Sequence, residues 1–134
     1  MATKIFLGIN AVLFIGYGLV CLASPSVVAD SAGLAVVTGD GAVELRAMYG
    51  GLQTAVGMLA LAALLRSELQ SAVLFVLAFL FFGLASARLL GTIIESGVGS
   101  YTFGALAFEI LFALVSFALF ARGGSGSGLS GNPA

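Results

Sequence analysis

Residues 103–120 read FGALAFEILFALVSFALF, and this stretch decides the fold. It is long enough to cross a bilayer as a helix, and its one charged residue is Glu109. A charged side chain at the centre of a spanning helix costs roughly 2.5–3.5 kcal/mol. Glu109 must therefore be paired, neutralised or in contact with water, which makes it the first candidate for a buried polar site.

The composition of the chain is that of an integral membrane protein. Hydrophobic residues make up 60% of the sequence, charged residues 8%, and the mean hydropathy is +1.18. The chain has no histidine, and Cys21 is its single cysteine, so the usual metal and haem sites lack ligands and no internal disulfide is expected. We expect no metal and no cofactor. The sparse charges also argue against a nucleic-acid partner.

Four stretches have the length and apolarity of spanning segments: residues 5–23, 45–65, 71–90 and 103–121. In lipid every backbone N–H and C=O group must be satisfied within the segment, so each stretch is expected to be a helix. We predict an all-α integral membrane four-helix bundle with antiparallel, up-down topology, in one domain over residues 1–122. An outer loop is expected over residues 24–43, and a flexible Gly/Ser-rich tail over residues 123–134.

The first segment has a second interpretation as a secretory signal peptide. Lys4 precedes the apolar run, and small residues such as Ala23 and Ser24 follow it. The run is longer than the roughly 7–15 residues of a signal-peptide core. A helix that remains in the membrane is therefore the favoured interpretation.

The basic residues predict the orientation. With four spans, Lys4, Arg66 and Arg122 share one side of the membrane. The opposite side carries four acidic residues: Asp30, Asp40, Glu44 and Glu95. The positive-inside rule then places both termini in the cytoplasm.

Polar residues of the second segment recur at three- and four-residue steps, which puts them on one helix face: Arg46, Tyr49 and Gln53, together with Gly50 and Gly57. Antiparallel order brings Arg46 and Arg88 to the same membrane surface. Glu109 lies eight residues beyond Tyr101, or roughly 12 Å below that surface, within reach of an arginine side chain. We therefore predict one buried cluster in the outer half of the bundle, formed by Glu44, Arg46, Tyr49, Gln53, Arg88 and Glu109.

This cluster has two interpretations. Buried polar residues can hold helices in one register, which is a structural role. Ionisable residues inside a membrane also mark ligand sites, relays and pathways. The sequence leaves both open.

Several motifs resemble a widespread bacterial family of small four-helix membrane proteins of unknown function, which is distantly similar to the DoxX-like proteins. They are ELRAMYGGLQ at residues 44–53, ARLLG at 87–91, ESG at 95–97 and AFEI at 107–110. The resemblance covers nearly all of the chain up to Arg122. It implies a four-helix fold and a location in the bacterial inner membrane, and it brings no known activity.

Three classes of function fit these residues. The first is binding or carriage of a small amphiphile of the lipid, quinone or isoprenoid type, with its polar head on Arg46 and Arg88. The second is an accessory or assembly subunit of a larger membrane complex, in which the cluster is purely structural. The third is a lipid-modifying, isomerase-like enzyme that uses Glu109 as acid or base. The expected partners are membrane lipids, and a second copy or a membrane-complex subunit is the alternative.

Overall fold

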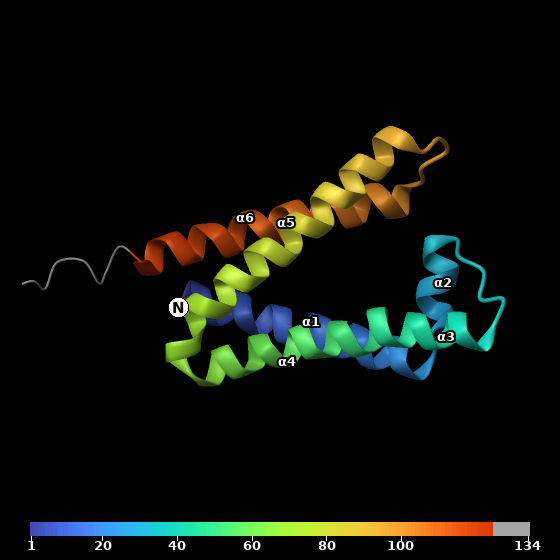
Figure 1. Cartoon of the computed structure of the whole chain (residues 1–134). Coiled ribbons are helices and arrows are strands. Elements are labelled where there is room, and N and C mark those ends of the chain that lie inside the picture. Colours follow the sequence, from blue (N-terminus) through green and yellow to red (C-terminus); the bar gives the residue numbers. More distant parts are fainter. Residues whose placement is uncertain (125–134) are drawn as a thin grey trace, which may run out of the picture. The chain divides into compact units, whose positions relative to one another are not determined.

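The computed structural model describes residues 1–124, and the regular structure within them is helical. The chain divides into two compact units, Met1–Ser67 and a second unit that begins at Glu68. Each unit contains one pair of long antiparallel helices (Figure 1).

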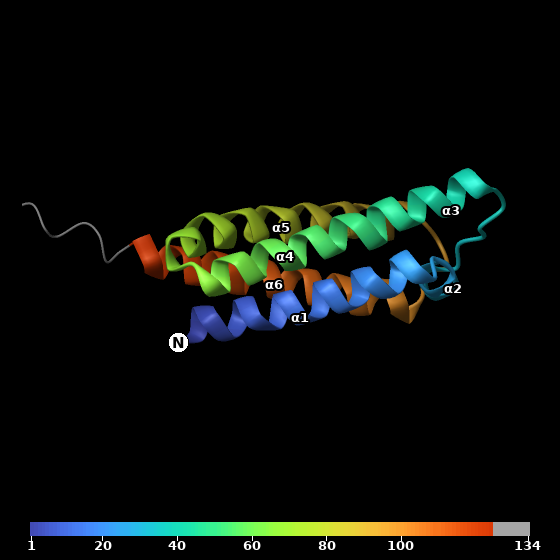
Figure 2. The same cartoon turned by 90° about the horizontal axis from the view of Figure 1, so that it is seen from below.

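The first unit pairs one straight helix with a second, composite one. Its elements are α1 (Ala2–Ala23), α2 (Ser26–Ala32), α3 (Gly39–Leu45), the π-helical segment η1 (Arg46–Gly51) and α4 (Leu52–Leu65). The last three form one continuous helix that runs antiparallel to α1 (Figures 1 and 2). Within η1 the winding widens, and the N–H of Leu52 donates to the carbonyl of Ala47, five residues back.

Glycines allow this composite helix to approach α1 closely. A Cβ atom on Gly57 would lie 2.6 Å from the backbone N of Ile15, and one on Gly50 would lie 2.6 Å from Cγ of Leu22. A Cβ on Gly18 would likewise lie 2.6 Å from the backbone N of Thr54. Real Cβ atoms do not come this close, so the helix pair depends on residues without side chains, as is common in membranes.

The second unit is a helical hairpin held by aromatic rings. A 3₁₀ turn, η2 (Ser67–Leu69), leads into α5 (Gln70–Ile94), and α6 (Ser100–Gly124) returns antiparallel to it. Phe75 contacts Phe120 and Phe81 contacts Phe112, each with ring centroids 5.3 Å apart. Both pairs join α5 to α6. In this unit the two helices are joined by contacts between aromatic rings, whereas in the first unit they are joined by close backbone contact.

Within residues 1–124, four helices are long and apolar enough to span a membrane, which confirms the prediction of an all-α, multi-pass membrane protein with antiparallel helix pairs. They are Ala2–Ala23, Gly39–Leu65, Ser67–Ile94 and Ser100–Gly123. The single four-helix domain over residues 1–122 stays a prediction.

The second spanning helix begins at Gly39, six residues before the expected start. Thr38 is its N-cap, and the Thr38 Oγ1 accepts a hydrogen bond of 3.1 Å from the N–H of Gly41. Asp40 in the first turn complements the helix dipole. The connection predicted over residues 24–43 is therefore shorter than expected, because the helix already begins at Gly39. It also contains the short helix α2.

Other helix ends also extend beyond their predicted limits. The third spanning helix continues to Ile94, and the fourth begins at Ser100 and continues through Gly124. Gly123 and Gly124 thus belong to α6 rather than to the predicted tail. The remainder of that tail, residues 125–134, lies outside the described residues.

The α1–α4 packing predicts opposite effects for two neighbouring glycines. Gly18→Ala forces a methyl group against the backbone of Thr54 and should destabilise the protein by about 1–3 kcal/mol, as overpacking does. Gly16 has no atom within 4 Å of the position that a Cβ would take, so Gly16→Ala should be neutral or gain up to about 1 kcal/mol from helix propensity. Unfolding in mixed detergent micelles would measure both. Equal effects of the two variants would contradict the close helix approach.

Candidate functional site

Arg88 and Glu109 form a partly buried ion pair between α5 and α6. The Arg88 Nη2 lies 2.7 Å from the Glu109 Oε1, and the Arg88 Nε donates to Oε2 at 2.9 Å and to Oε1 at 3.1 Å. This two-nitrogen fork matches the planar carboxylate. The sequence required a partner, a proton or water for Glu109, and the structure provides a partner of opposite charge, Arg88.

The two side chains differ in exposure. The Glu109 side chain is 7% exposed, and that of Arg88 is 27% exposed. Glu109 lies nine residues into α6, or roughly 14 Å from its first residue. The carboxylate is therefore enclosed, whereas the Arg88 side chain is partly exposed.

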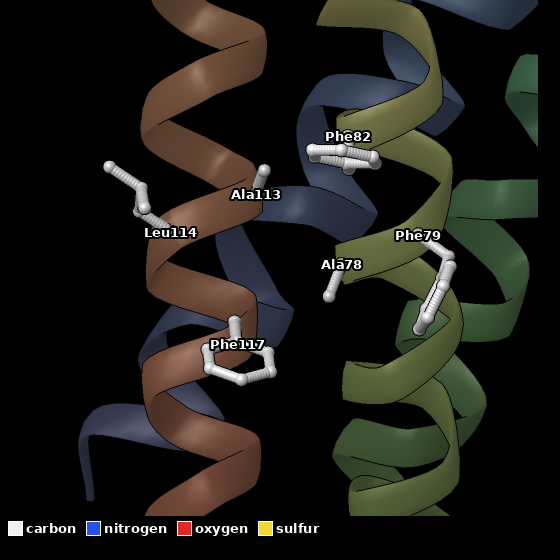
Figure 3. Close-up of a pocket in the computed structure, with 6 residues that line it drawn as sticks. All are labelled: Ala78, Phe79, Phe82, Ala113, Leu114 and Phe117. Carbon is white, nitrogen blue, oxygen red and sulfur yellow. The ribbon is translucent and has the colours of Figure 1, made fainter. Parts of the chain in front are cut away.

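An apolar groove lies along one flank of the same helix pair. Two adjoining hollows of about 270 and 260 Å³ make up this α5–α6 groove. Figure 3 shows the first hollow, which is lined by Ala78, Phe79, Phe82, Ala113, Leu114 and Phe117. The second shares Phe82, Ala113 and Leu114 with it and adds Ala85, Ser86, Leu89 and Ile110.

Small and large side chains together produce the groove. The methyl groups of Ala78 and Ala113 lie between the two helices, and the rings of Phe82 and Phe117 flank them (Figure 3). The small side chains of Ala78 and Ala113 leave space between the helices, and the phenylalanine rings form the borders of that space. Sequence reasoning did not identify this groove, because the alternation of Ala and Phe signals a cavity only after the partner helix and its register are known.

The groove ends at the depth of the ion pair. Leu89 and Ile110 line this end, and they are the sequence neighbours of Arg88 and Glu109. From Ala78 to Leu89 the groove follows α5 for roughly 16 Å at helical rise. It is therefore an apolar channel, open on one side, whose end lies at the depth of the ion pair, and neither Arg88 nor Glu109 is among its lining residues.

The remaining predicted residues belong to the first unit. The Arg46 Nε donates to the carbonyl of Leu22 at 3.0 Å, which satisfies one of the free carbonyls at the end of α1. Glu44 is exposed, whereas Tyr49 and Gln53 are half-buried. Arg46 thus has a backbone partner that the sequence did not indicate.

The predicted six-residue cluster joins residues of both units. The structure brings Arg88 and Glu109 together within the second unit. It places Glu44, Arg46, Tyr49 and Gln53 on the first unit's composite helix, between its fifth residue after Gly39 and its middle. The complete cluster stays a prediction.

Two further polar side chains are buried in the spanning helices. Asn10 is fully buried, and its Nδ2 donates to the Phe6 carbonyl at 2.8 Å within α1. Its Oδ1, like the Oγ of fully buried Ser116, has no hydrogen-bond partner among the described residues. The Asn10 side chain thus bonds to its own helix through its amide nitrogen.

Replacing one partner of the ion pair should lower the free energy of unfolding more than replacing both partners. Glu109→Leu leaves the Arg88 charge uncompensated, and such losses reach about 3–5 kcal/mol for fully buried pairs; the partial exposure of Arg88 should reduce this value. The double variant Arg88→Met, Glu109→Leu should recover much of the loss. Free energies of unfolding in mixed micelles, compared in a double-mutant cycle, would test the coupling. Strictly additive losses would contradict it.

No curated protein and no solved structure matches the chain. A family model does match: the model of a domain of unknown function, DUF4345, aligns with residues 2–120. The match covers most of the sequence, including all four candidate spans apart from the last residues of α6. The resemblance to a family of unknown function is thereby confirmed at this level, and the chain belongs to the DUF4345 family.

Proposed function

We propose that this protein binds a small amphiphile of the lipid, quinone or isoprenoid type within the membrane. Its apolar body occupies the α5–α6 groove, and its polar head lies at the depth of Arg88 and Glu109. The observation that supports this proposal is an apolar groove whose end, at Leu89 and Ile110, lies at the depth of the Arg88–Glu109 pair. Ligand sites of this kind are mostly apolar with a few placed polar groups.

The length of the groove supports an apolar body the size of one leaflet. Its roughly 16 Å along α5 is about half of the ~30 Å hydrocarbon core. A tail in the groove would extend from the depth of the ion pair towards the other membrane surface. The ring faces of Phe82 and Phe117 offer extensive contact area to such a tail.

The ion pair favours an uncharged head group. The Arg88 Nε and Nη2 both donate to Glu109, so the pair as a whole carries no net charge. An anionic phosphate would compete with Glu109 for the same fork. A hydroxyl or carbonyl group can instead lie against the partly exposed Arg88 side chain without displacing Glu109. Among the amphiphiles considered, the ion pair therefore favours those with a quinone carbonyl or an alcohol as the head group.

The proposed location is the bacterial inner membrane, with both termini in the cytoplasm. The family resemblance of the sequence supports the location, and the basic residues Lys4, Arg66 and Arg122 support the orientation.

Orientation can be tested with topology reporters. An alkaline-phosphatase domain fused after Arg122 should be inactive in a bacterial host, because the rule for basic residues places that end in the cytoplasm. A green fluorescent reporter at the same position should be fluorescent. The reverse pattern would show that the termini face the periplasm.

Ligand retention is best tested by native mass spectrometry of protein released in mild detergent. The wild type should carry a bound amphiphile. Ala113→Phe fills the groove at the point where the two hollows meet, and it should reduce ligand occupancy at least tenfold. Ala118→Phe is the matched control, since Ala118 is exposed on α6 and does not line the groove.

The possible outcomes separate the functions. Loss of ligand in Ala113→Phe with retention in Ala118→Phe supports the groove as the site. A wild type without ligand, or equal occupancy in all three proteins, overturns the proposal. A ligand-free wild type that copurifies with another membrane protein would favour the accessory-subunit interpretation.

A further inference from the structure

The turn between α2 and α3, residues 33–38, exposes apolar side chains outside the long helix pair. Val37 is 84% exposed, Leu34 is 47% exposed and Val36 is 41% exposed. Gly33 at φ 70° ends α2 in the left-handed conformation and directs the chain into the turn. No charged residue lies between Asp30 and Asp40. An uncharged, apolar turn of this kind is poorly suited to water.

The arginines of the composite helix indicate the depth of this turn. Arg46 lies seven residues into the candidate span Gly39–Leu65, and Arg66 directly follows that span. The two arginines are twenty residues apart, or about 30 Å at α-helical rise, which equals the thickness of the hydrocarbon core. Arg46 therefore lies at one boundary of that core. Its hydrogen bond to the carbonyl of Leu22 holds the end of α1 at the same boundary.

The short helix α2 keeps the chain near this boundary. Pro25 disfavours helical backbone at Ser24, so α1 ends at Ala23 and α2 starts just beyond it, at Ser26. It then runs across the axis of α1 instead of continuing along it (Figures 1 and 2). Val28 and Ala29 are buried. A helix that crosses the membrane normal at boundary depth lies along the membrane surface.

The other end of the turn is also close to the lipid. Gly39, where α3 begins, lies seven residues before Arg46, or about 10 Å beyond the hydrocarbon core for an upright helix. The head-group layer occupies much of that distance, since the whole bilayer is about 40–45 Å thick. Residues 33–38 therefore connect two points that both border the head-group region.

We propose that the turn 33–38 inserts into the head-group and acyl boundary of the bilayer, with Leu34, Val36 and Val37 as its lipid contacts. The occupant of this apolar surface is the membrane that holds the protein, because the spans on either side of the turn keep it at that surface. The turn is an interfacial anchor, and this role is independent of ligand binding in the α5–α6 groove.

Tryptophan fluorescence offers a direct test, because the chain contains no tryptophan. Val37→Trp in liposomes should be quenched by lipids brominated near the head group more strongly than by lipids brominated near the chain end. Its quenching by aqueous iodide should be at least threefold weaker than that of Ser96→Trp, a control in the exposed turn after α5. Leu111→Trp, exposed on the middle of α6, should respond most to the deep bromines.

A second reporter tests whether the native valines drive the insertion. Leu34→Trp should give the same pattern as Val37→Trp. Adding Val36→Asn and Val37→Asn to this reporter should raise its iodide quenching at least twofold. Both reporters are compared with the wild type by thermal unfolding, so that a folding defect is recognised.

Two results would overturn the proposal. Iodide quenching of both turn reporters equal to that of Ser96→Trp would show that the turn stands in water. Protection from both iodide and brominated lipids would show that protein covers the turn, either from the same chain or from a second copy. Dilution of the protein in the liposomes would then distinguish these two covers.

Discussion

A polar group in hydrocarbon is costly unless it has a partner within the protein, and this constraint explains the polar contacts of the spanning helices. Helices satisfy it for the backbone along all four spans. Side chains satisfy it at three further places: Glu109 accepts from the fork of Arg88, the Arg46 Nε donates to the last turn of α1, and the Asn10 amide nitrogen donates within its own helix. The first two contacts join one helix to another: α5 to α6, and the composite helix to α1.

The two helix pairs reach stability by different routes. In the first unit, glycines bring α1 and the composite helix into backbone contact. In the second unit, phenylalanine rings of α5 pack against those of α6, with centroids 5.3 Å apart. Close backbone contact leaves little room for a ligand, whereas ring-mediated packing with interspersed alanines leaves a groove. The sequence difference between the two hairpins thus explains why a groove forms between α5 and α6.

The long helices could be predicted from apolar length alone, and Glu109 from its isolation among apolar residues. Antiparallel order and depth put both Arg46 and Arg88 within reach of Glu109, and the sequence did not decide between them; the structure pairs Glu109 with Arg88. Three features of the structure could not be predicted from the sequence, each for a physical reason. The start at Gly39 depends on a single cap at Thr38, which an apolar-run criterion ignores. The partner of Arg46 is a backbone carbonyl, which no residue type reveals. The groove depends on the register between α5 and α6, which is set only when the rings pack.

The π-helical segment Arg46–Gly51 makes the first unit tolerant of a change in chain length at one place. Its wider winding holds one extra residue between α3 and α4 without breaking the helix, since the N–H of Leu52 donates to a carbonyl five residues back. Removing one residue there would restore regular winding and keep α3 and α4 in nearly the same rotation, so that Arg46 would still face the end of α1. The same deletion within α4 would rotate one part of the helix by about 100° relative to the other and turn one of them away from α1. A single-codon deletion should therefore be tolerated in the π-helical segment and should disrupt the helix pair a few residues later.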